Sequence, residues 1–292
     1  MNYRLKSLLL FPMNVLYAIN PKLELELMFW LKQGYKLNFK NPKTYNEKIN
    51  WQKLYYKNEL FSVCSDKYHV REFVESRGCG EFLNTLLWSG YNAEDIPFDT
   101  LPEQFVIKAT HGSGFNIICK DKKTLNRAET IKTLNKWLKT KFLVCYGEHW
   151  YGEKRPRIVV EKYMEDPSNP RLFDYKFFCF DGEPRYVYVD TWKDGQHHIN
   201  MYDVDLKLLS HVSLGYPLDL ETPIEKPANY EQMLEVARTL SKGFPHVRVD
   251  LYSIGGSRTI FGEMTFSKGA GFDRILPYEF DEEMGDWFNL GD

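Results

Sequence analysis

The sequence predicts an α+β fold with antiparallel sheets. Helical patterns dominate the first 100 residues, whereas after Pro102 short apolar runs alternate with turn signals. Strands joined by tight turns pair antiparallel, because parallel neighbours need a long crossover. We therefore expect a mostly helical region over residues 1–100 and a sheet-rich domain over residues 101–292.

The helical region contains two clear start signals. Thr44 and Glu47 have the spacing of a capping box, in which the threonine hydroxyl accepts from the third amide and the glutamate carboxylate reaches back. This predicts a helix over about 45–57. Asp66 can cap a second helix, with apolar residues at helical spacing, that ends near Arg77 and before Gly78.

The most apolar stretch runs from Leu8 to Ile19. With its break at Pro12 it falls short of the roughly 18 to 20 residues that span a bilayer. Basic residues precede it, as in a weak export signal, but the sequence at 19–22 is a poor cleavage site. We expect a helix that docks on the rest of the chain.

The remaining elements follow in a regular order. We predict a strand at 105–107, a small-residue turn and a returning strand at 115–120, an amphipathic helix over 127–141, a buried strand at 158–161, a hairpin of 175–180 and 186–192 around Asp181-Gly182, a helix over about 230–242, and a final hairpin of 247–252 and 259–264.

Composition excludes several classes of protein. The 38 Lys and Arg against 40 Asp and Glu leave a net charge of -2, so the basic excess typical of nucleic-acid binding is absent. The five cysteines are odd in number, scattered and without a C-x-x-C pair, which argues against a disulfide framework or a zinc site. A reducing cytoplasm is the expected compartment.

The final hairpin carries the clearest chemistry. If Gly255-Gly256 is a two-residue turn, Asp250 lies opposite Phe261 and Arg248 lies opposite Glu263. Alternation then places Arg248, Asp250 and Glu263 on one face. The other face carries Val247, Val249, Leu251 and Ile260. Neighbouring carboxylates suit a hard divalent cation such as Mg²⁺, and a solvated face with an Arg–Glu pair is the open alternative.

A second candidate site begins at Lys108, which closes an apolar strand. In the following His111-Gly112-Ser113-Gly114 turn, glycines let the backbone approach a phosphate, and the lysine supplies a point charge. The P-loop pattern is absent. A strand-end lysine beside an ordinary hairpin turn therefore remains an alternative.

Two further groups have a functional and a structural interpretation. Glu161 ends a buried strand, and with Lys162 and Met164 it has the arrangement of a hinge whose backbone reads an adenine edge. A surface Glu–Lys pair is the alternative. Asp174 and Lys176 share one strand face, directed either to the same cleft or to solvent.

In this order the pieces resemble the ATP-grasp superfamily, in particular its TupA-like branch from surface-polysaccharide gene clusters. The matching phrases are Asn41-Pro42-Lys43-Thr44-Tyr45-Asn46-Glu47-Lys48, Asp66-Lys67-Tyr68 with Val70-Arg71, Phe105 to Gly114, Asp174 to Phe178, and Gly262-Glu263. The resemblance covers about residues 35–280. It implies two α+β subdomains that grip ATP, a small lid with the phosphate loop over 101–165 and a larger part with a metal-binding hairpin over 166–292.

The resemblance also implies roles for individual residues. In the ATP site, Lys108 would contact the phosphates beneath a mobile loop of His111, Gly112, Ser113 and Gly114, while Glu161, Lys162 and Met164 would form the adenine hinge and Asp174 and Lys176 the ribose side. Mg²⁺ would be held by Asp250 and Glu263, and the catalytic set would be Arg248, Lys108 and Lys268.

Two departures from the family pattern stand out. The family often has Asn two residues after the metal-binding Glu, whereas this chain has Thr265, which leaves the number of metal ions open. The usual N-terminal Rossmann-like domain is not evident in the first 100 residues.

The activity that the resemblance implies is an ATP-dependent ligase. It would join a uronic acid carboxylate to an amino acid or another amine, through an acyl phosphate, in capsule or O-antigen biosynthesis. The expected partners are a small-molecule or saccharide carboxylate and an amine, with no nucleic acid. Peripheral association with membrane-bound polysaccharide assembly machinery is left open.

Three alternatives belong to other functional classes. A glycosyltransferase would need a metal-binding D-x-D motif, and Asp203-Val204-Asp205 has that spacing, although a turn at a strand end is the simpler interpretation. An ATP-grasp phosphotransferase would stop at a stable phosphate ester. A regulatory protein would bind the nucleotide without turnover.

Overall fold

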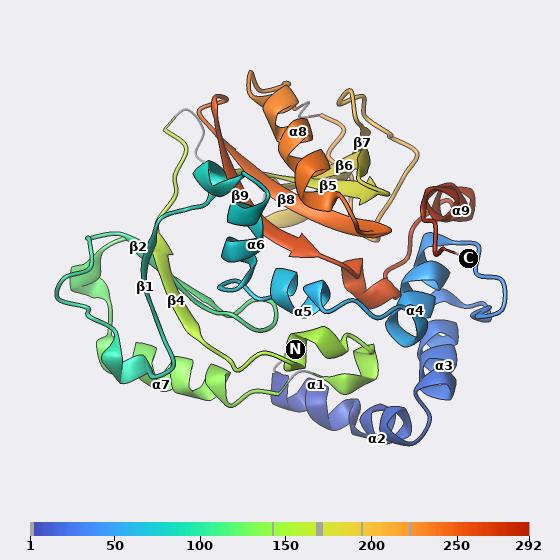
Figure 1. Cartoon of the computed structure of the whole chain (residues 1–292), viewed down its shortest axis with the longest axis horizontal. Helices are drawn as coiled ribbons and strands as arrows, with labels where there is room; N and C mark the ends of the chain where they lie inside the picture. The colour runs from blue at the N-terminus through green and yellow to red at the C-terminus, as the bar shows by residue number, and fades with distance from the viewer. Residues whose placement is uncertain (1–2, 142, 168–171, 194, 222–223, 292) are drawn as a thin grey trace.

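The chain forms two antiparallel sheets with helices packed around them (Figure 1). The computed structural model describes residues 3–141, 143–167, 172–193, 195–221 and 224–291. Strand order is β1-β4-β2-β3 in the small sheet and β7-β6-β5-β8-β9 in the large sheet. The α+β prediction is confirmed.

The small sheet combines the predicted hairpin with two other strands. It contains β1 (Leu86–Gly90), β4 (Ile158–Lys162), β2 (Phe105–Ala109) and β3 (Asn116–Cys119). The predicted amphipathic helix, α7 (Arg127–Leu138), packs Leu134 into the core of this sheet. Strand β1 was not predicted, and it pairs with β4 although it lies before residue 100. The domain boundary at residue 100 stays a prediction.

The large sheet contains both other predicted hairpins. Its strands are β5 (Phe173–Phe180), β6 (Glu183–Lys193), β7 (Gln196–Asp203), β8 (His246–Ile254) and β9 (Arg258–Thr265). Asp181 and Gly182 both have positive φ, 48° and 84°, as the tight turn between β5 and β6 requires.

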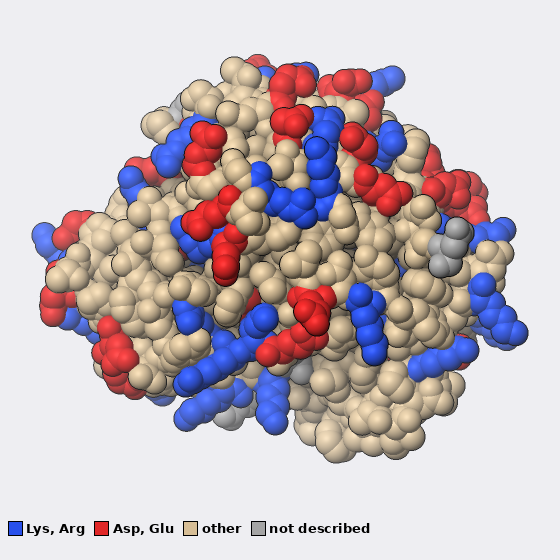
Figure 2. All heavy atoms as spheres, viewed as in Figure 1, with Lys and Arg blue, Asp and Glu red and all other residues tan. Residues whose placement is uncertain are grey.

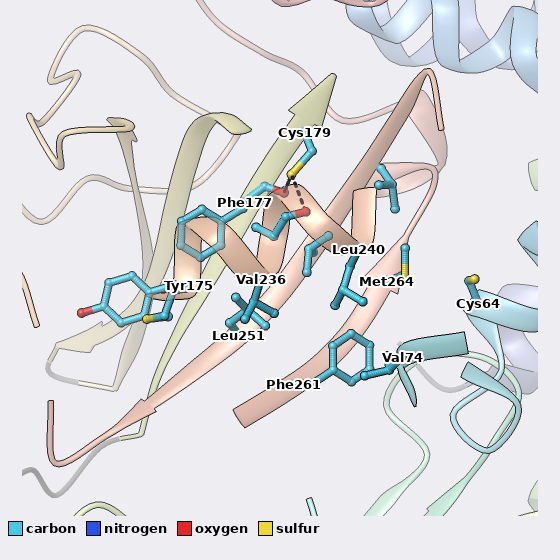
Figure 3. Packing of buried hydrophobic residues seen from close by; sticks show 14 of the residues in the cluster. Cys64, Val74, Tyr175, Phe177, Cys179, Val236, Leu240, Leu251, Phe261 and Met264 are labelled. Atoms are coloured by element: carbon cyan, nitrogen blue, oxygen red, sulfur yellow. Dashed lines mark hydrogen bonds between the residues drawn. The ribbon is translucent and has the colours of Figure 1, made fainter. Parts of the chain in front are cut away.

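One face of the large sheet is covered by α8 (Tyr230–Ser241), with α5 (Leu60–Ser65) and α6 (Val70–Ser76) at its edge. Figure 3 shows Phe177 and Leu251 of the sheet facing Val236 and Leu240 of α8. All five cysteines are free and buried.

The opposite face is only partly covered by helices. At one end α4 (Tyr45–Tyr55) and α9 (Tyr278–Trp287) pack Tyr45 and Phe280 against Phe178 and Tyr186. Both hydrogen bonds of the predicted capping box at the start of α4 are present. The other end of this face carries ionisable side chains.

The first three helices form a layer at the edge of the molecule. These are α1 (Tyr3–Leu9), α2 (Phe11–Ile19) and α3 (Pro21–Gln33). Met13 and Tyr17 of α2 pack on a core cluster that includes Phe29 and Phe272, so the predicted docking of this segment is confirmed. None of the helices in the described part of the chain is long and apolar enough to cross a membrane.

Candidate functional site

One row across the large sheet brings four polar side chains into register. Tyr188 of β6 lies opposite Lys176 of β5, Lys176 lies opposite Asp250 of β8, and Asp250 lies opposite Glu263 of β9. Because side chains alternate along each strand, all four point to the same side of the sheet, which we call the charged face. It continues the face that α4 and α9 cover.

The last hairpin reaches this register differently from the prediction. Its loop contains three residues, 255–257, because Ile254 pairs with Arg258. An irregularity between Asp250 and Leu251, opposite Gly262, then shifts the pairing by one further residue. The two shifts together restore the predicted face of Glu263.

The predicted cross-strand partners and the face of one residue were wrong. Asp250 pairs with Glu263 rather than Phe261, and Arg248 pairs with Thr265. Ile260 pairs with Tyr252 and lies outside the core cluster that contains Leu251, whereas Phe261 lies inside that cluster. Because the second shift compensates the first, Glu263 keeps its predicted face. Ile260 lies between the two shifts and takes the face opposite to the predicted one.

Arg248 connects the polar side chains of the charged face. Its Nε and Nη2 donate to the two carboxylate oxygens of Asp250, each at 2.6 Å. The same Nη2 lies 3.1 Å from Oε1 of Glu263 and 3.0 Å from Oγ1 of Thr265, and Nη1 donates to the Tyr188 hydroxyl at 2.9 Å. Both Arg248 and Asp250 are buried. A guanidinium thus lies between the two carboxylates and offsets their repulsion.

Lys176 organises the acids at the neighbouring end of the charged face. Its ammonium pairs with Asp174 and, at 2.8 Å, with Asp190, which also contacts Nε2 of His197 at 2.8 Å. Burial alone would lower the pKa of Lys176, but Asp174, Asp250 and Asp190 outweigh it and raise that pKa. The lysine therefore stays charged, and Asp174 and Lys176 lie in the ion-pair network of this face.

Glu263 and Asp250 of the charged face differ in how far their carboxylates are exposed. The Glu263 side chain is 45% exposed, whereas Asp250 is 2% exposed. Burial would raise the pKa of Glu263, but Lys67, Arg248 and Lys176 outweigh it and lower that pKa, so the carboxylate is ionised at neutral pH. Oδ1 of Asp174 is buried without a hydrogen-bond partner among the described residues.

The donor set suits a nucleotide-linked Mg²⁺ better than an all-protein metal site. Asp250 and Glu263 occupy directly opposed positions, but both oxygens of Asp250 accept from Arg248, so Glu263 has the exposed carboxylate in this structure. Across the described part of the chain, no group of three or more His, Cys, Asp and Glu side chains is placed to hold a metal. Mg²⁺ commonly takes one or two protein carboxylates and completes its shell with water and phosphate oxygens. The exposed Glu263, with Asp250 beside it, fits that pattern.

On the small sheet, Lys108 and Glu161 form an ion pair. The Lys108 ammonium donates to Oε2 of Glu161 at 2.7 Å, and Arg71 lies 3.8 Å from the other oxygen. The structure therefore brings the predicted phosphate lysine and the predicted hinge acid together. Glu161 is buried, while Lys162, the next residue, is exposed.

In the predicted hinge, the backbone amide and carbonyl of Lys162 already have hydrogen-bond partners. The Lys162 amide donates to the Thr85 carbonyl at 3.0 Å, and its carbonyl accepts from Asn84 at 2.8 Å. A carbonyl oxygen has a second lone pair, so that atom retains acceptor capacity. Met164, half-buried, follows the end of β4.

The predicted phosphate loop is anchored at its start. Nε2 of His111 donates to the carbonyls of Trp137 and Thr140, each at 3.1 Å, at the end of α7. Burial lowers the pKa of His111, so its imidazole is neutral at pH 7 and positions the loop rather than contributing charge. Gly112 and Gly114 have φ of 78° and 76°, which glycine adopts at little cost.

Lys67 links this loop to the large sheet, and the sequence did not single out its side chain. Its ammonium donates to the Gly112 carbonyl at 3.2 Å and lies 4.0 Å from Oε2 of Glu263. The Asp66-Lys67-Tyr68 phrase was noted for the family resemblance, and Asp66 as a possible helix cap. Asp66 accepts from the Tyr68 and His69 amides, ahead of α6, whose N-cap position is His69. Only the tertiary structure shows that the lysine between them reaches both parts of the site.

A cavity of about 620 Å³ lies where these parts meet. Among the predicted site residues, its wall contains His111, Gly112, Ser113, Arg248 and Glu263, and Lys67 lies beside them. The other predicted site residues lie outside this wall: Lys108, Gly114, Glu161, Lys162, Met164, Asp174, Lys176, Asp250 and Lys268. The structure therefore assembles the phosphate loop with the last hairpin, but places the Lys108–Glu161 pair apart from the cavity.

Lys268 lies behind the cavity. Its side chain is buried and pairs at 2.8 Å with Asp273, which is on the cavity wall. Burial lowers the pKa of Lys268, and the nearby Asp273 acts against that effect. Lys268 can therefore orient Asp273, and its expected catalytic part stays a prediction.

The alternative metal motif at 203–205 is a turn. Oδ1 of Asp203, the last residue of β7, accepts from the Asp205 and Lys207 amides at 3.0 and 2.9 Å. The simpler interpretation of this segment is confirmed. His197 and His198 lie in β7, a strand that was not predicted. The pairing of β7 with β6 brings His197 to Asp190.

Comparison with known proteins gives one family match and several similar solved structures. The model of the TupA-like ATPgrasp family matches residues 47–289. No curated protein matches the chain. A D-alanine–D-alanine ligase from Bacillus anthracis, solved with ATP, is 15% identical with a TM-score of 0.42, over 71% of this chain and 57% of that one.

Two further solved structures give similar values. An N5-carboxyaminoimidazole synthetase from Staphylococcus aureus, solved with ADP, is 12% identical with a TM-score of 0.43, over 70% of this chain and 44% of that one. A D-alanine–D-alanine ligase from Helicobacter pylori is 12% identical with a TM-score of 0.43, over 78% of this chain and 62% of that one. The chain thus spans less than two thirds of each of these three structures.

Proposed function

The chain belongs to the TupA-like ATP-grasp family, and from that premise we propose that it is an ATP-dependent carboxylate–amine ligase. Its substrates would be a uronic acid of a cell-surface saccharide and an amino acid or another amine. The product would be an amide. The reaction would take place in the cytoplasm during capsule or O-antigen biosynthesis, with peripheral association with the membrane-bound assembly machinery.

One observation carries this proposal. Arg248 and Glu263 lie on a cavity wall that also contains the glycine loop, and Arg248 contacts both Glu263 and the buried Asp250 behind it. A fixed cation, two carboxylates and a glycine loop whose Ser113 and Gly114 are exposed match the charge pattern that phosphoryl transfer requires, because positioning and electrostatic stabilisation supply most of its catalysis.

The proposed chemistry proceeds in two balanced steps. A carboxylate oxygen of the uronic acid attacks the γ-phosphorus of ATP, the bond to the β–γ bridging oxygen breaks, and ADP leaves with that electron pair. The amine nitrogen then attacks the carbonyl carbon of the acyl phosphate, the bond to the phosphate oxygen breaks, and the amine loses a proton. No side-chain nucleophile is required.

The chain's own residues supply charge and position in these steps. Arg248 and Lys67 would bind the anionic groups in the cavity, and the Gly112–Ser113 amides would face the phosphates. Asp250 and Glu263 would hold Mg²⁺, which when bound supplies positive charge to the phosphate oxygens. Lys108 would reach the phosphates only by leaving Glu161, its partner in this structure.

A thermal-shift titration tests nucleotide recognition first. A ligand at 100 times its Kd adds about 2.7 kcal/mol of apparent stability, enough for a visible rise in Tm. We expect ATP and ADP to raise the Tm in a Mg²⁺-dependent manner. UDP- and GDP-sugars are the controls, and a response to them alone would replace the ligase with a glycosyltransferase.

A product assay then tests the reaction. Purified protein, ATP and Mg²⁺ are incubated with a matrix of uronic acids and amines, and ADP, phosphate and amide are measured. We expect ADP release that requires both substrates, with equal amounts of phosphate and amide. ADP release without the amine, together with a stable phosphate ester, would identify a phosphotransferase instead.

A further inference from the structure

The outer side of the N-terminal helices exposes large apolar side chains. On α1 and α2 these residues are Leu8, Leu9, Phe11, Val15 and Ile19. Three of them, Leu8, Phe11 and Ile19, are 71%, 63% and 77% exposed. Their spacing of three or four residues places most of them on one stripe of the helical segment. Isolated exposed apolar residues are ordinary, but a continuous stripe is not.

The next helix continues this surface. Leu23, Leu27, Trp30 and Leu31 of α3 are also exposed and recur at helical spacing. Helices α2 and α3 pack against each other around Asn20, which caps α3 through the Leu23 amide. We call the exposed apolar residues of α1, α2 and α3 together the docking face.

The fold of the chain does not use the docking face. The opposite side of α2 supplies Met13 and Tyr17 to the internal cluster, as does Leu10 just before it, and Asn14 accepts from the Cys145 amide at 3.0 Å. Helix α3 likewise buries Leu25, Met28 and Phe29 on its inner side. The helices are thus anchored by one side, and the apolar residues on the other side have no role in that packing.

Charge around the docking face points to its partner. Residues 3–33, which include α1–α3, contain four Lys or Arg and two Glu, a net charge of +2, whereas the whole chain carries -2. Glu24, one of the two acids, is buried, while Lys22, Lys32 and Lys36 are exposed. In Figure 2 the surface over α2, at the lower right, is uncharged and is bordered by blue Lys and Arg side chains.

An apolar stripe with a basic border is typical of a surface that lies at a membrane interface. Leu and Phe side chains enter the boundary between headgroups and acyl chains, Trp favours that depth, and lysines at the border contact anionic phosphates. A protein partner would require shape complementarity, but a bilayer requires only an apolar stripe with a basic border. The apolar stripe lies on these three helices, and Lys22 and Lys32 of α3, with Lys36 just after it, supply exposed basic side chains.

The docking face also adjoins the cavity. Lys6 of α1 and Lys32 of α3 lie on the cavity wall, and their neighbours Leu8 and Leu31 belong to the docking face. Lys6 lies over the Tyr146 ring at 5.0 Å, which fixes α1 beside the cavity. A surface that covered the docking face would therefore lie next to the cavity mouth.

We propose that the docking face binds the surface of an anionic lipid bilayer, with α1–α3 lying in the headgroup region and no helix crossing it. Binding combines burial of the apolar stripe with attraction of the basic border to anionic headgroups. It is independent of the reaction that the cavity serves, and it brings the cavity to the membrane.

Vesicle flotation of the full chain, without nucleotide, tests this proposal. We expect binding to vesicles of phosphatidylglycerol and phosphatidylcholine, weaker binding as salt is raised, and little binding to pure phosphatidylcholine. Phe11→Ser and Trp30→Ser should each weaken binding by about tenfold or more, because each removes a large apolar side chain from the interface. Lys22→Glu with Lys36→Glu should weaken binding to anionic vesicles only.

Two controls keep the result interpretable. Leu220→Ser removes an equally exposed apolar side chain, 60% exposed, far along the sequence from the docking face, and should bind vesicles as the unmodified chain does. The Tm of every variant reports folding. Equal binding to neutral and anionic vesicles, or no binding to either, would overturn the proposal.

One alternative occupant is checked in parallel. Size-exclusion chromatography with light scattering measures the mass of the chain and of the Phe11→Ser variant. A dimer that the variant loses, with no vesicle binding by the unmodified chain, would assign the docking face to self-association and refute the bilayer. Because no nucleotide enters either measurement, failure here leaves the proposed ligase activity intact.

Discussion

Arg248 holds both carboxylate oxygens of Asp250 at 2.6 Å from a position two residues earlier on the same strand. Side chains two apart on a strand point the same way, so the pair forms without help from another element. Both residues are buried, and removing one partner of such a pair typically costs about 3–5 kcal/mol because the other charge is left unpaired. The pair therefore contributes to stability, and Arg248 also contacts Glu263 on the cavity wall.

Arg248→Lys separates these two contributions. A lysine keeps the positive charge but cannot donate two parallel hydrogen bonds to one carboxylate. We expect a modest fall in Tm and a fall in the rate of ADP formation of about tenfold or more, since fixed donors in a buried site dominate stabilisation of developing charge. Arg238→Lys, on α8 with Glu183 and Glu235 as partners, is the matched control. An unchanged rate in the Arg248 variant would remove this residue from the catalytic set.

Glu263→Gln tests the proposed metal ligand. The substitution keeps the size of the side chain and removes its charge. We expect turnover to fall on the order of 10² or more, because metal charge stabilisation contributes several kcal/mol to such reactions. The Mg²⁺ concentration for half-maximal ADP formation should rise at the same time. Glu231→Gln, at an exposed position on α8, is the control, and a near-normal rate with Glu263→Gln would exclude the assignment.

The parts of the fold that were predicted correctly have local causes. The start of α4 follows from Thr44 and Glu47, three residues apart, and the turn after β5 follows from Asp181 and Gly182 alone. The face of Asp250 follows from alternation along a single strand. Signals of this kind need no knowledge of the rest of the chain.

The parts that were missed depend on distant contacts or on one irregular residue. The pairing of β8 with β9 changes at Gly262, where an added Cβ would lie 3.0 Å from the Asp250 carbonyl, and a glycine inside a strand is a known signal for such an irregularity. Lys67 reaches Gly112 and Glu263 only because the turn between α5 and α6, the loop and the hairpin meet in space. No spacing rule connects positions so far apart.

Lys108→Ala tests whether this lysine serves ATP or only Glu161. Loss of a phosphate contact should weaken ATP affinity, measured by thermal-shift or calorimetric titration with Mg²⁺. The variant also leaves Glu161 with Arg71 alone, 3.8 Å away, so the Tm of the variant without nucleotide is recorded first. Lys132→Ala, exposed on α7, is the control. Unchanged nucleotide affinity would restrict Lys108 to a structural ion pair.

Gly112→Ala tests the conformation of the phosphate loop. An alanine at φ of 78° costs about 1–2 kcal/mol, and its Cβ would meet the Phe115 ring at 3.5 Å. We expect the loop to shift and the KM for ATP to rise, with a smaller effect on kcat. Gly78→Ala imposes a similar strain at φ of 75°, at the end of α6 and with open space around it. Equal effects on KM in both variants would show that strain alone, and not the loop, is responsible.

A buried acid behind the cavity makes stability depend on pH. Glu24 of α3 is fully buried, and neither carboxylate oxygen has a hydrogen-bond partner among the described residues. Burial raises the pKa of Glu24 from 4.5 to about 8, against the lowering effect of Lys53. Between these two values the folded chain retains a proton that the unfolded chain has released, so the Glu24 contribution to stability falls as pH rises.

Glu24→Gln should remove this dependence. The Tm of the variant relative to the unmodified chain should become more favourable as pH rises from about 4.5 to about 8, because a neutral amide carries no cost of ionisation in the buried position. Glu26→Gln removes a carboxylate from the same helix at a partly exposed position and is the matched control. The prediction would be wrong if both variants showed the same pH trend, or if the Glu24 variant lost stability relative to the unmodified chain at higher pH. Either result would mean that Glu24 is already ionised in the folded chain.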